Sequence, residues 1–150
     1  MMNVKIDTDS LGFLISDSLR VMRMAFDRRI ADAGLGITPG EARVLLNVAA
    51  ADGSRQLEIA ARMGVEPMTV CTFLDKLQAQ ELIERQPDPT DRRAKKIMLT
   101  EKADGMVETI RTEMRVVVDQ ATRGMSPETK TVLHDALKQF RDNLQNPDNA

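Results

Sequence analysis

The chain has 150 residues, of which 42% are hydrophobic and 29% are charged, so its composition is that of an ordinary globular protein and excludes a disordered or collagen-like chain. Its formal net charge is −2, so any surface that binds nucleic acid must be a local basic patch. Short apolar runs, an N-terminus without a signal-peptide pattern and a single cysteine predict a cytoplasmic protein with no membrane partner and no intramolecular disulfide.

The first predicted helix follows residues 7–10, whose side chains can cap a helix N-terminus. Apolar residues then recur at steps of three and four positions, which places them on one face of a helix. Gly34 and Gly36 end this pattern. The apolar residues are Leu11, Ile15, Leu19, Met22, Phe26 and Ile30.

The second predicted helix begins with a clear start signal. Thr38 can cap it, Pro39 suits the first helical position, and Glu41 can complete a capping box with Thr38. We expect this helix to stop near residues 52–53.

Two short helices with a tight turn between them are predicted next. Residues 57–63 form the first, Gly64 can adopt the left-handed conformation after it, and Pro67 begins the second. Ala60 supplies a small side chain where the two helices cross. This arrangement is a helix-turn-helix, although helix pairs of this size are also ordinary corners of all-α proteins.

A charged hairpin follows the second of these helices. Residues 82–86 and 95–99 read as two short strands around a turn-rich segment. Charge runs usually form solvated loops, but a hairpin directly after a helix-turn-helix can act as a wing that contacts phosphates or the minor groove. The basic residues here are Arg85, Arg92, Arg93, Lys95 and Lys96, against the acidic Asp88 and Asp91.

Two more helices complete the chain. Thr100 is expected to cap a long helix whose apolar positions average 3.5 residues apart, the period of a helix that packs along another helix. Gly124 ends it, and residues 126–128 begin a last helix with one apolar face. The predicted order is four helices, two strands and two helices, a mainly α fold with a small β-hairpin wing. The apolar positions are Ala103, Val107, Ile110, Met114, Val117 and Ala121, then Leu133, Leu137, Phe140 and Leu144.

The ends of the chain carry more apolar surface than a small winged domain can cover. We therefore expect residues 1–36 and 101–150 to form a helical dimerisation domain and residues 37–100 to form the winged helix-turn-helix domain. Packing of these helices within a single chain is the alternative.

Residues 56–106, above all residues 91–103, resemble the MarR family of bacterial regulators, close to its SlyA branch. The resemblance rests on an Asp-x-Arg wing signature followed by a strand that ends in Leu-Thr, and length and helix order extend it over nearly the whole chain. It implies a homodimer that binds a palindromic operator in double-stranded DNA and represses transcription or antagonises a silencer. It also implies release by a small aromatic or lipophilic acid.

The resemblance assigns roles to individual residues. Arg93 would enter the minor groove, where a guanidinium suits the electronegative floor, and Asp91 would orient it. One position departs from the SlyA branch, because Thr72 stands where arginine is common, so the sequence preference would depend more on DNA shape. Phosphate candidates are Arg92, Lys95 and Lys96 in the wing and Thr38, Arg55 and Gln56 at helix starts, and the recognition helix would present Pro67, Met68, Thr69 and Thr72.

Other candidate sites are weaker. Family members bind ligands between the dimerisation helices and the winged domain. The candidate pocket residues are therefore Arg20, Met22, Phe26, Arg43 and Leu46, although a Met stripe at helical spacing is usually plain core. Cys71 lies early in the recognition helix, where oxidation would disturb DNA contacts, or it is simply a packing residue. His134 is solitary, so neither a metal site nor a cofactor is expected.

Two other function classes can be weighed against a DNA-binding regulator. Enzyme activity has no support, because the sequence lacks a Gly-rich phosphate loop, a metal set and a nucleophile–base pair. A winged helix can also act as a protein-interaction or dimerisation module without DNA binding, but such a module has no need of Asp91, Arg93 and the flanking lysines. A redox-sensing regulator that uses Cys71 is a further alternative.

Overall fold

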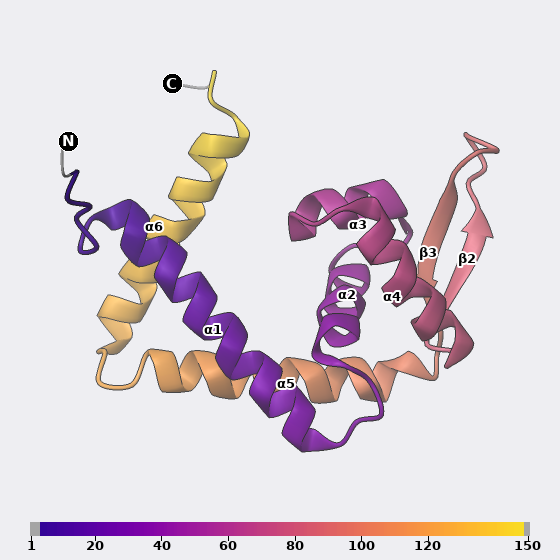
Figure 1. The fold of residues 1–150 in the computed structure, drawn as a ribbon, viewed down its shortest axis with the longest axis horizontal. Coiled ribbons are helices and arrows are strands. Elements are labelled where there is room, and N and C mark those ends of the chain that lie inside the picture. Colours follow the sequence, from indigo (N-terminus) through magenta and orange to yellow (C-terminus); the bar gives the residue numbers. More distant parts are fainter. Residues whose placement is uncertain (1–3, 149–150) are drawn as a thin grey trace. The chain divides into compact units, whose positions relative to one another are not determined.

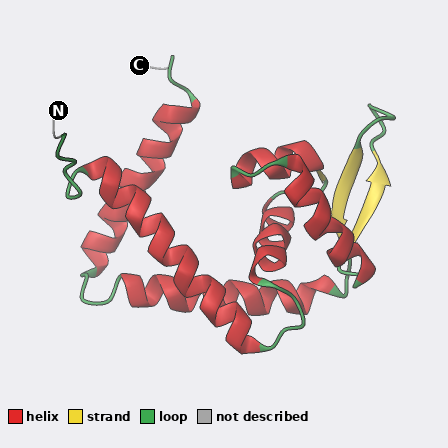
Figure 2. Cartoon of the chain, viewed as in Figure 1, coloured by secondary structure: helices red, strands yellow, loops and turns green. Residues whose placement is uncertain are grey.

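A computed structural model describes residues 4–148 of the chain. Within these residues the fold is mainly helical with a small three-stranded antiparallel sheet, which confirms the expected fold class (Figure 2). No helix in this range has both the length and the apolar character that crossing a membrane would require. The elements are α1 (Leu11–Ala33), α2 (Pro39–Ala50), β1 (Ser54–Arg55), α3 (Gln56–Met63), α4 (Pro67–Ala79), β2 (Ile83–Pro87), β3 (Lys95–Leu99), α5 (Ala103–Ala121) and α6 (Pro127–Gln145).

The chain divides into two compact units, residues 1–117 and 118–150. The first unit contains α1 to α4, the sheet and most of α5, and the second contains the end of α5 and α6. The expected dimerisation and winged domains, with boundaries at residues 36 and 101, stay a prediction.

Local start and stop signals explain where the helices begin and end. Thr38 Oγ1 accepts a hydrogen bond from the backbone N–H of Glu41 at 3.2 Å, and the Glu41 carboxylate accepts one from the N–H of Thr38 at 2.9 Å. This is the predicted capping box, and it fixes the start of α2. Gly64 ends α3 in the left-handed conformation at φ +65°, where a side chain would be strained. The short α3–turn–α4 unit therefore forms as predicted.

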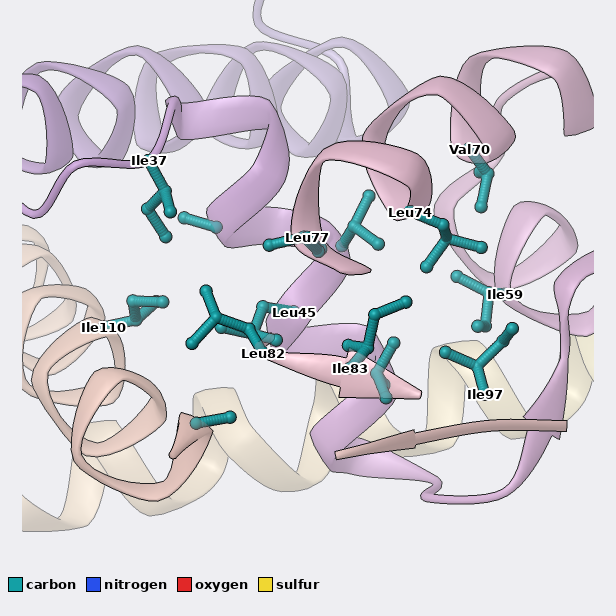
Figure 3. Packing of buried hydrophobic residues seen from close by; sticks show 14 of the residues in the cluster. Ile37, Leu45, Ile59, Val70, Leu74, Leu77, Leu82, Ile83, Ile97 and Ile110 are labelled. Atoms are coloured by element: carbon teal, nitrogen blue, oxygen red, sulfur yellow. The ribbon is translucent and has the colours of Figure 1, made fainter. Parts of the chain in front are cut away.

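One hydrophobic core holds the first unit together. Side chains from α2, α4 and the sheet meet in it, as Figure 3 shows for Leu45, Leu74, Ile83 and Ile97, which are all fully buried. Residues of α1 and α5 also belong to this cluster, among them Ile110. Because full burial of such a side chain contributes about 1.5–3 kcal/mol, this core fixes the helix-turn-helix and the sheet as one body.

The sheet contains a strand that the sequence analysis missed. β1 pairs antiparallel with β3 through Ser54 opposite Ile97 and Arg55 opposite Lys96, and the strand order is β1-β3-β2. Two residues are too few to show the alternation that predicts a strand, so only the hairpin was expected. Because β1 runs directly into α3, its pairing with β3 attaches the base of the hairpin to the start of α3.

The start of α5 also differs from the prediction. Thr100 was expected to cap this helix, but its hydroxyl donates a hydrogen bond to the carbonyl of Glu81 at 2.6 Å, and the helix begins at Ala103. Thr100 therefore ties the end of β3 to the turn after α4. The capping prediction was wrong because a local sequence pattern does not show a hydrogen-bond partner 19 residues away.

The second unit leaves an apolar face uncovered. α6 begins where predicted, with Ser126 as its cap, yet none of its residues is buried. Leu133, Leu137 and Phe140 remain substantially exposed on one side of the helix. Within the second unit nothing covers this face, and exposed apolar patches of this kind are often interaction surfaces.

Candidate nucleic-acid interface

Arg85 joins the hairpin to α4. Its guanidinium donates to the Gln78 side chain at 2.5 Å, to Asp75 at 2.7 Å and to the carbonyl of Cys71 at 3.5 Å. β2 therefore lies beside α4, as Figure 1 also shows. Arg85 belongs to the basic segment of the sequence, but in the structure its charge is paired with Asp75.

The remaining basic residues of the hairpin are available to a ligand. Arg92, Arg93 and Lys95 are exposed and Lys96 is half-buried. Across residues 4–148, no ion pair or hydrogen bond engages the side chain of any of these four. Arg92 and Arg93 lie in the loop between β2 and β3, which Figure 1 shows extending beyond the strands, and Lys95 and Lys96 are the first residues of β3, so the hairpin carries four cations within five positions.

Asp91 shapes the backbone of this tip. Its Oδ1 accepts a hydrogen bond from the backbone N–H of Arg93 at 2.9 Å, the pattern of an Asx turn. The expected contact between the Asp91 carboxylate and the Arg93 guanidinium is not among the bonds of the described residues. Orientation of that guanidinium by Asp91 therefore stays a prediction.

Asp88, which the sequence analysis did not single out, is the most constrained polar residue of the wing. Its side chain is only 4% exposed. Oδ1 accepts from the backbone N–H of Thr90 at 2.8 Å and from its hydroxyl at 2.7 Å, while Oδ2 accepts from Nε of Arg55 at 2.7 Å. The two bonds from Thr90, then the bond from Arg55, hold the pKa of the Asp88 carboxyl well below its ordinary value of 3.8.

Arg55 was expected to contact phosphate, and in the structure its guanidinium has a partner within the protein. Besides its bond to Asp88, its Nη2 donates to the hydroxyl of Thr90 at 3.2 Å. The Asp88 carboxylate accordingly raises the pKa of Arg55 above its ordinary value. The Asp-Pro-Thr run at residues 88–90 is a turn signal that could have pointed to Asp88, but nothing local links it to Arg55.

The first two turns of α4 present small polar and flexible apolar groups. Met68 is 76% exposed, and Thr69 and Thr72 are also exposed, while Pro67 is half-buried. The Thr72 hydroxyl donates to the carbonyl of Met68 at 3.1 Å, so its oxygen is left as an acceptor. These two turns contain no basic side chain.

The geometry agrees with comparisons to known proteins. A family model described as MarR family matches residues 35–94. The crystal structure of the transcriptional regulator PA3341 is 33% identical over 91% of this chain and 99% of that chain, with a TM-score of 0.77. The chain belongs to the MarR family of transcriptional regulators.

Two further structures share this fold at lower identity. Wild-type MarR from E. coli in its apo form is 20% identical, with a TM-score of 0.75 over 91% of this chain and 98% of that chain. The transcriptional repressor CouR, bound to a 23-mer DNA duplex, is 23% identical, with a TM-score of 0.71 over 92% and 99%. The MarR-type fold therefore extends over nearly the whole chain.

Two other predicted phosphate contacts lie at helix starts of this MarR-family chain. Gln56 Nε2 donates to the carbonyl of Pro67 at 3.2 Å and so ties the start of α3 to the start of α4. Thr38 is exposed, and its capping role uses the hydroxyl oxygen as an acceptor, which leaves the proton for an outside partner. Phosphate contacts by both residues stay predictions.

The residues predicted to line a pocket all lie in the first unit. Phe26 is buried in the hydrophobic core, and Arg43 forms an ion pair with Asp27, which already neutralises its charge. Arg20 is exposed on α1 and bonds to Asp17 at 3.4 Å. The pocket itself stays a prediction. Of the five residues, Met22 and Leu46 are half-buried against the core.

Cys71 lies in the second turn of α4 and is half-buried. Its carbonyl accepts the hydrogen bond from Arg85, so its backbone belongs to the junction between α4 and the wing. The redox role of its thiol stays a prediction.

Proposed function

We propose that this chain is a homodimeric transcriptional regulator that binds a palindromic operator in double-stranded DNA, with α4 in the major groove and the wing in the adjacent minor groove. The observation that carries the proposal is the group of four wing cations without internal partners in the described range, on a hairpin that Arg85 joins to α4. Because one rigid body carries both elements, one duplex can engage both at once. The DNA-bound CouR structure, which has the same fold, supports this partner.

The wing supplies the electrostatic part of the proposed binding. Arg93 would enter the minor groove, and Arg92, Lys95 and Lys96 would contact phosphates. On α4, Met68 can contact a thymine methyl group, while Pro67, Thr69 and Thr72 lie beside it at the helix start. The hydroxyls of Thr69 and Thr72 can contact base edges or phosphates.

Exposed apolar faces within each of the two units support dimerisation. α6 has no buried residue, and Leu11, Leu14 and Leu19 of α1 are also exposed. Burial of these faces against a second copy supports the proposed dimerisation domain, residues 1–36 and 101–150. The dimer would present two wings to the two half-sites of an operator.

The proposal extends to regulation as the family resemblance suggests. The regulator would repress transcription or antagonise a silencer, as in the SlyA branch that its wing motif resembles. A small aromatic or lipophilic acid near Phe26, Leu46 and Arg43 would favour a dimer whose wings no longer fit the operator.

Fluorescence anisotropy with a duplex from the region upstream of the chain's own coding sequence tests DNA binding. Affinity should fall steeply between about 50 and about 200 mM NaCl, because phosphate contacts release counterions. Arg93→Ala should weaken binding about tenfold and reduce the magnitude of the log–log salt slope by about 1. Lys138→Ala is the matched control, because it removes one positive charge from an exposed position on α6. Binding without salt dependence, or full affinity in Arg93→Ala, would contradict the proposal.

A further inference from the structure

Three residues form a polar clamp at the base of the wing tip, which we name the wing clamp: Arg55, Asp88 and Thr90. Both carboxylate oxygens of Asp88 are used, one by Thr90 and the other by Arg55, and Arg55 also bonds to Thr90. The Asp88 side chain is 96% shielded from solvent, since only 4% of it is exposed. A buried carboxylate with every bond satisfied is held in one position, because any displacement leaves its charge unpaired.

The wing clamp joins two parts of the structure that are far apart in the sequence. Arg55 is the second residue of β1 and directly precedes α3. Its backbone N–H donates to the carboxylate of Glu58 at the start of that helix at 3.1 Å. Asp88 directly follows β2, and its backbone N–H donates to the carbonyl of Ala94 at 3.2 Å. The clamp therefore ties the loop of residues 88–94, which carries the tip arginines, to the start of the helix-turn-helix.

We infer that Arg55 is a positioning residue for DNA binding: it holds the wing tip at a fixed place relative to α3 and α4 and is not itself a phosphate contact. The inference rests on the proposed function. Arg93 and α4 engage the same duplex most tightly if the distance between them is set in advance, because ordering a mobile tip on binding would cost affinity. The wing clamp sets that distance at the base of the loop.

The alternative, in which Arg55 contacts phosphate, predicts the opposite effect of removing Asp88. Asp88→Asn makes the chain more positive by one charge and releases Arg55. If Arg55 contacts phosphate, the substitution should leave affinity unchanged or raise it. If the wing clamp positions the tip, affinity should fall despite the added positive charge. In either orientation of the Asn side chain its NH2 group faces a donor, which is Nε of Arg55 or the backbone N–H of Thr90, so one bond of the clamp is lost.

The experiment measures affinity for the same duplex by anisotropy in wild type, Asp88→Asn and Glu84→Gln. Glu84→Gln is the matched control, because it makes the same charge change on exposed β2, outside the wing clamp. We expect Asp88→Asn to bind about tenfold more weakly, similar to loss of the Arg93 contact, and Glu84→Gln to bind as tightly as wild type or more tightly. Equal or tighter binding by Asp88→Asn overturns the inference.

A second substitution separates position from charge at Arg55 itself and covers the case in which Asp88→Asn folds poorly. Arg55→Lys keeps a positive charge that can contact phosphate, but it lacks the planar guanidinium that donates to Asp88 and to Thr90 at the same time. We expect Arg55→Lys to lose affinity nearly as much as Arg55→Ala. Wild-type affinity in Arg55→Lys with a loss in Arg55→Ala would assign Arg55 to phosphate and overturn the inference.

Hydrogen exchange in the DNA-free protein distinguishes failure of the wing clamp from failure of the proposed function. Amide exchange over residues 88–94 should speed up in Asp88→Asn, whereas exchange in α4 should be unchanged. Unchanged exchange over residues 88–94 would show that the clamp does not order the tip. Lack of salt-dependent duplex binding by the wild type would overturn the proposed function, and the exchange result would still decide whether the clamp orders the tip.

Discussion

Truncation of two side chains on α6 is the most direct test of the proposed dimer. Leu137 is 46% exposed and Phe140 is 41% exposed, and both lie on the apolar face of this helix. Complete burial of such side chains contributes about 1.5–3 kcal/mol each, so covering the exposed fraction contributes about 1 kcal/mol per side chain. A two-fold dimer covers both copies of each. Replacement of both by alanine should therefore cost about 4 kcal/mol of association free energy, about a thousandfold in the dimer dissociation constant.

Sedimentation equilibrium over a range of concentrations measures this change. The double variant Leu137→Ala/Phe140→Ala should become monomeric at concentrations where the wild type is dimeric. Its far-ultraviolet circular dichroism should keep its helical signal, because α6 has no buried residue to lose and alanine favours helix. Lys138→Ala/Gln139→Ala is the control, since these exposed residues lie on the other side of α6. A wild-type dissociation constant in the double variant would refute the assignment of α6 to the dimer interface.

Two further substitutions test packing and charge within the first unit. A Cβ at Gly40 would lie 2.5 Å from the end of the Phe73 ring, so Gly40→Ala should lower the unfolding free energy by about 1–3 kcal/mol. Adding Phe73→Leu to this variant should restore part of the loss. Equal urea midpoints for Gly40→Ala and wild type would contradict this prediction. The lowered pKa of Asp88 means that its bonds stabilise the fold fully above its ordinary pKa of 3.8 and progressively less as pH falls below it. The difference in urea midpoint between wild type and Asp88→Asn should therefore be constant from about pH 5 to about pH 8 and shrink below about pH 4. A difference that stays constant down to about pH 3 would contradict this prediction.

Helices were predictable from the sequence because their ends are marked by residues close together in the chain. The capping box of Thr38 and Glu41 and the left-handed Gly64 each act within four residues, so a linear pattern contains them. β1 was not predictable, because a two-residue strand exists only through its pairing with β3, more than 40 positions further along the chain. The role of Thr100 was missed for the same reason, since its partner Glu81 lies across a turn.

The sequence alone predicted that the hairpin is basic, but it predicted only in part which of these residues are free to bind a ligand. The sequence places the basic residues of the hairpin in one short segment, but it does not show which of them have partners. Arg85 bonds to α4 and Arg55 bonds to Asp88, a residue 33 positions away. Side chains of one type thus divide into those that hold the fold and those left for a ligand, and only the three-dimensional contacts separate them.

This division also explains how a chain of net charge −2 can present a cationic tip. Asp88 lies within the same segment as the basic residues, but Arg55 compensates its charge at 2.7 Å and its side chain is buried. Within residues 88–94, Asp91 is then the one acidic residue whose charge is not compensated by an ion pair, and it is half-buried and accepts a bond from the backbone of Arg93. Salt at 0.1 M screens charges beyond about 10 Å, so acidic residues further away contribute little to the potential that a phosphate meets at the tip. Affinity for DNA should therefore follow the charge of the tip and not the charge of the whole chain.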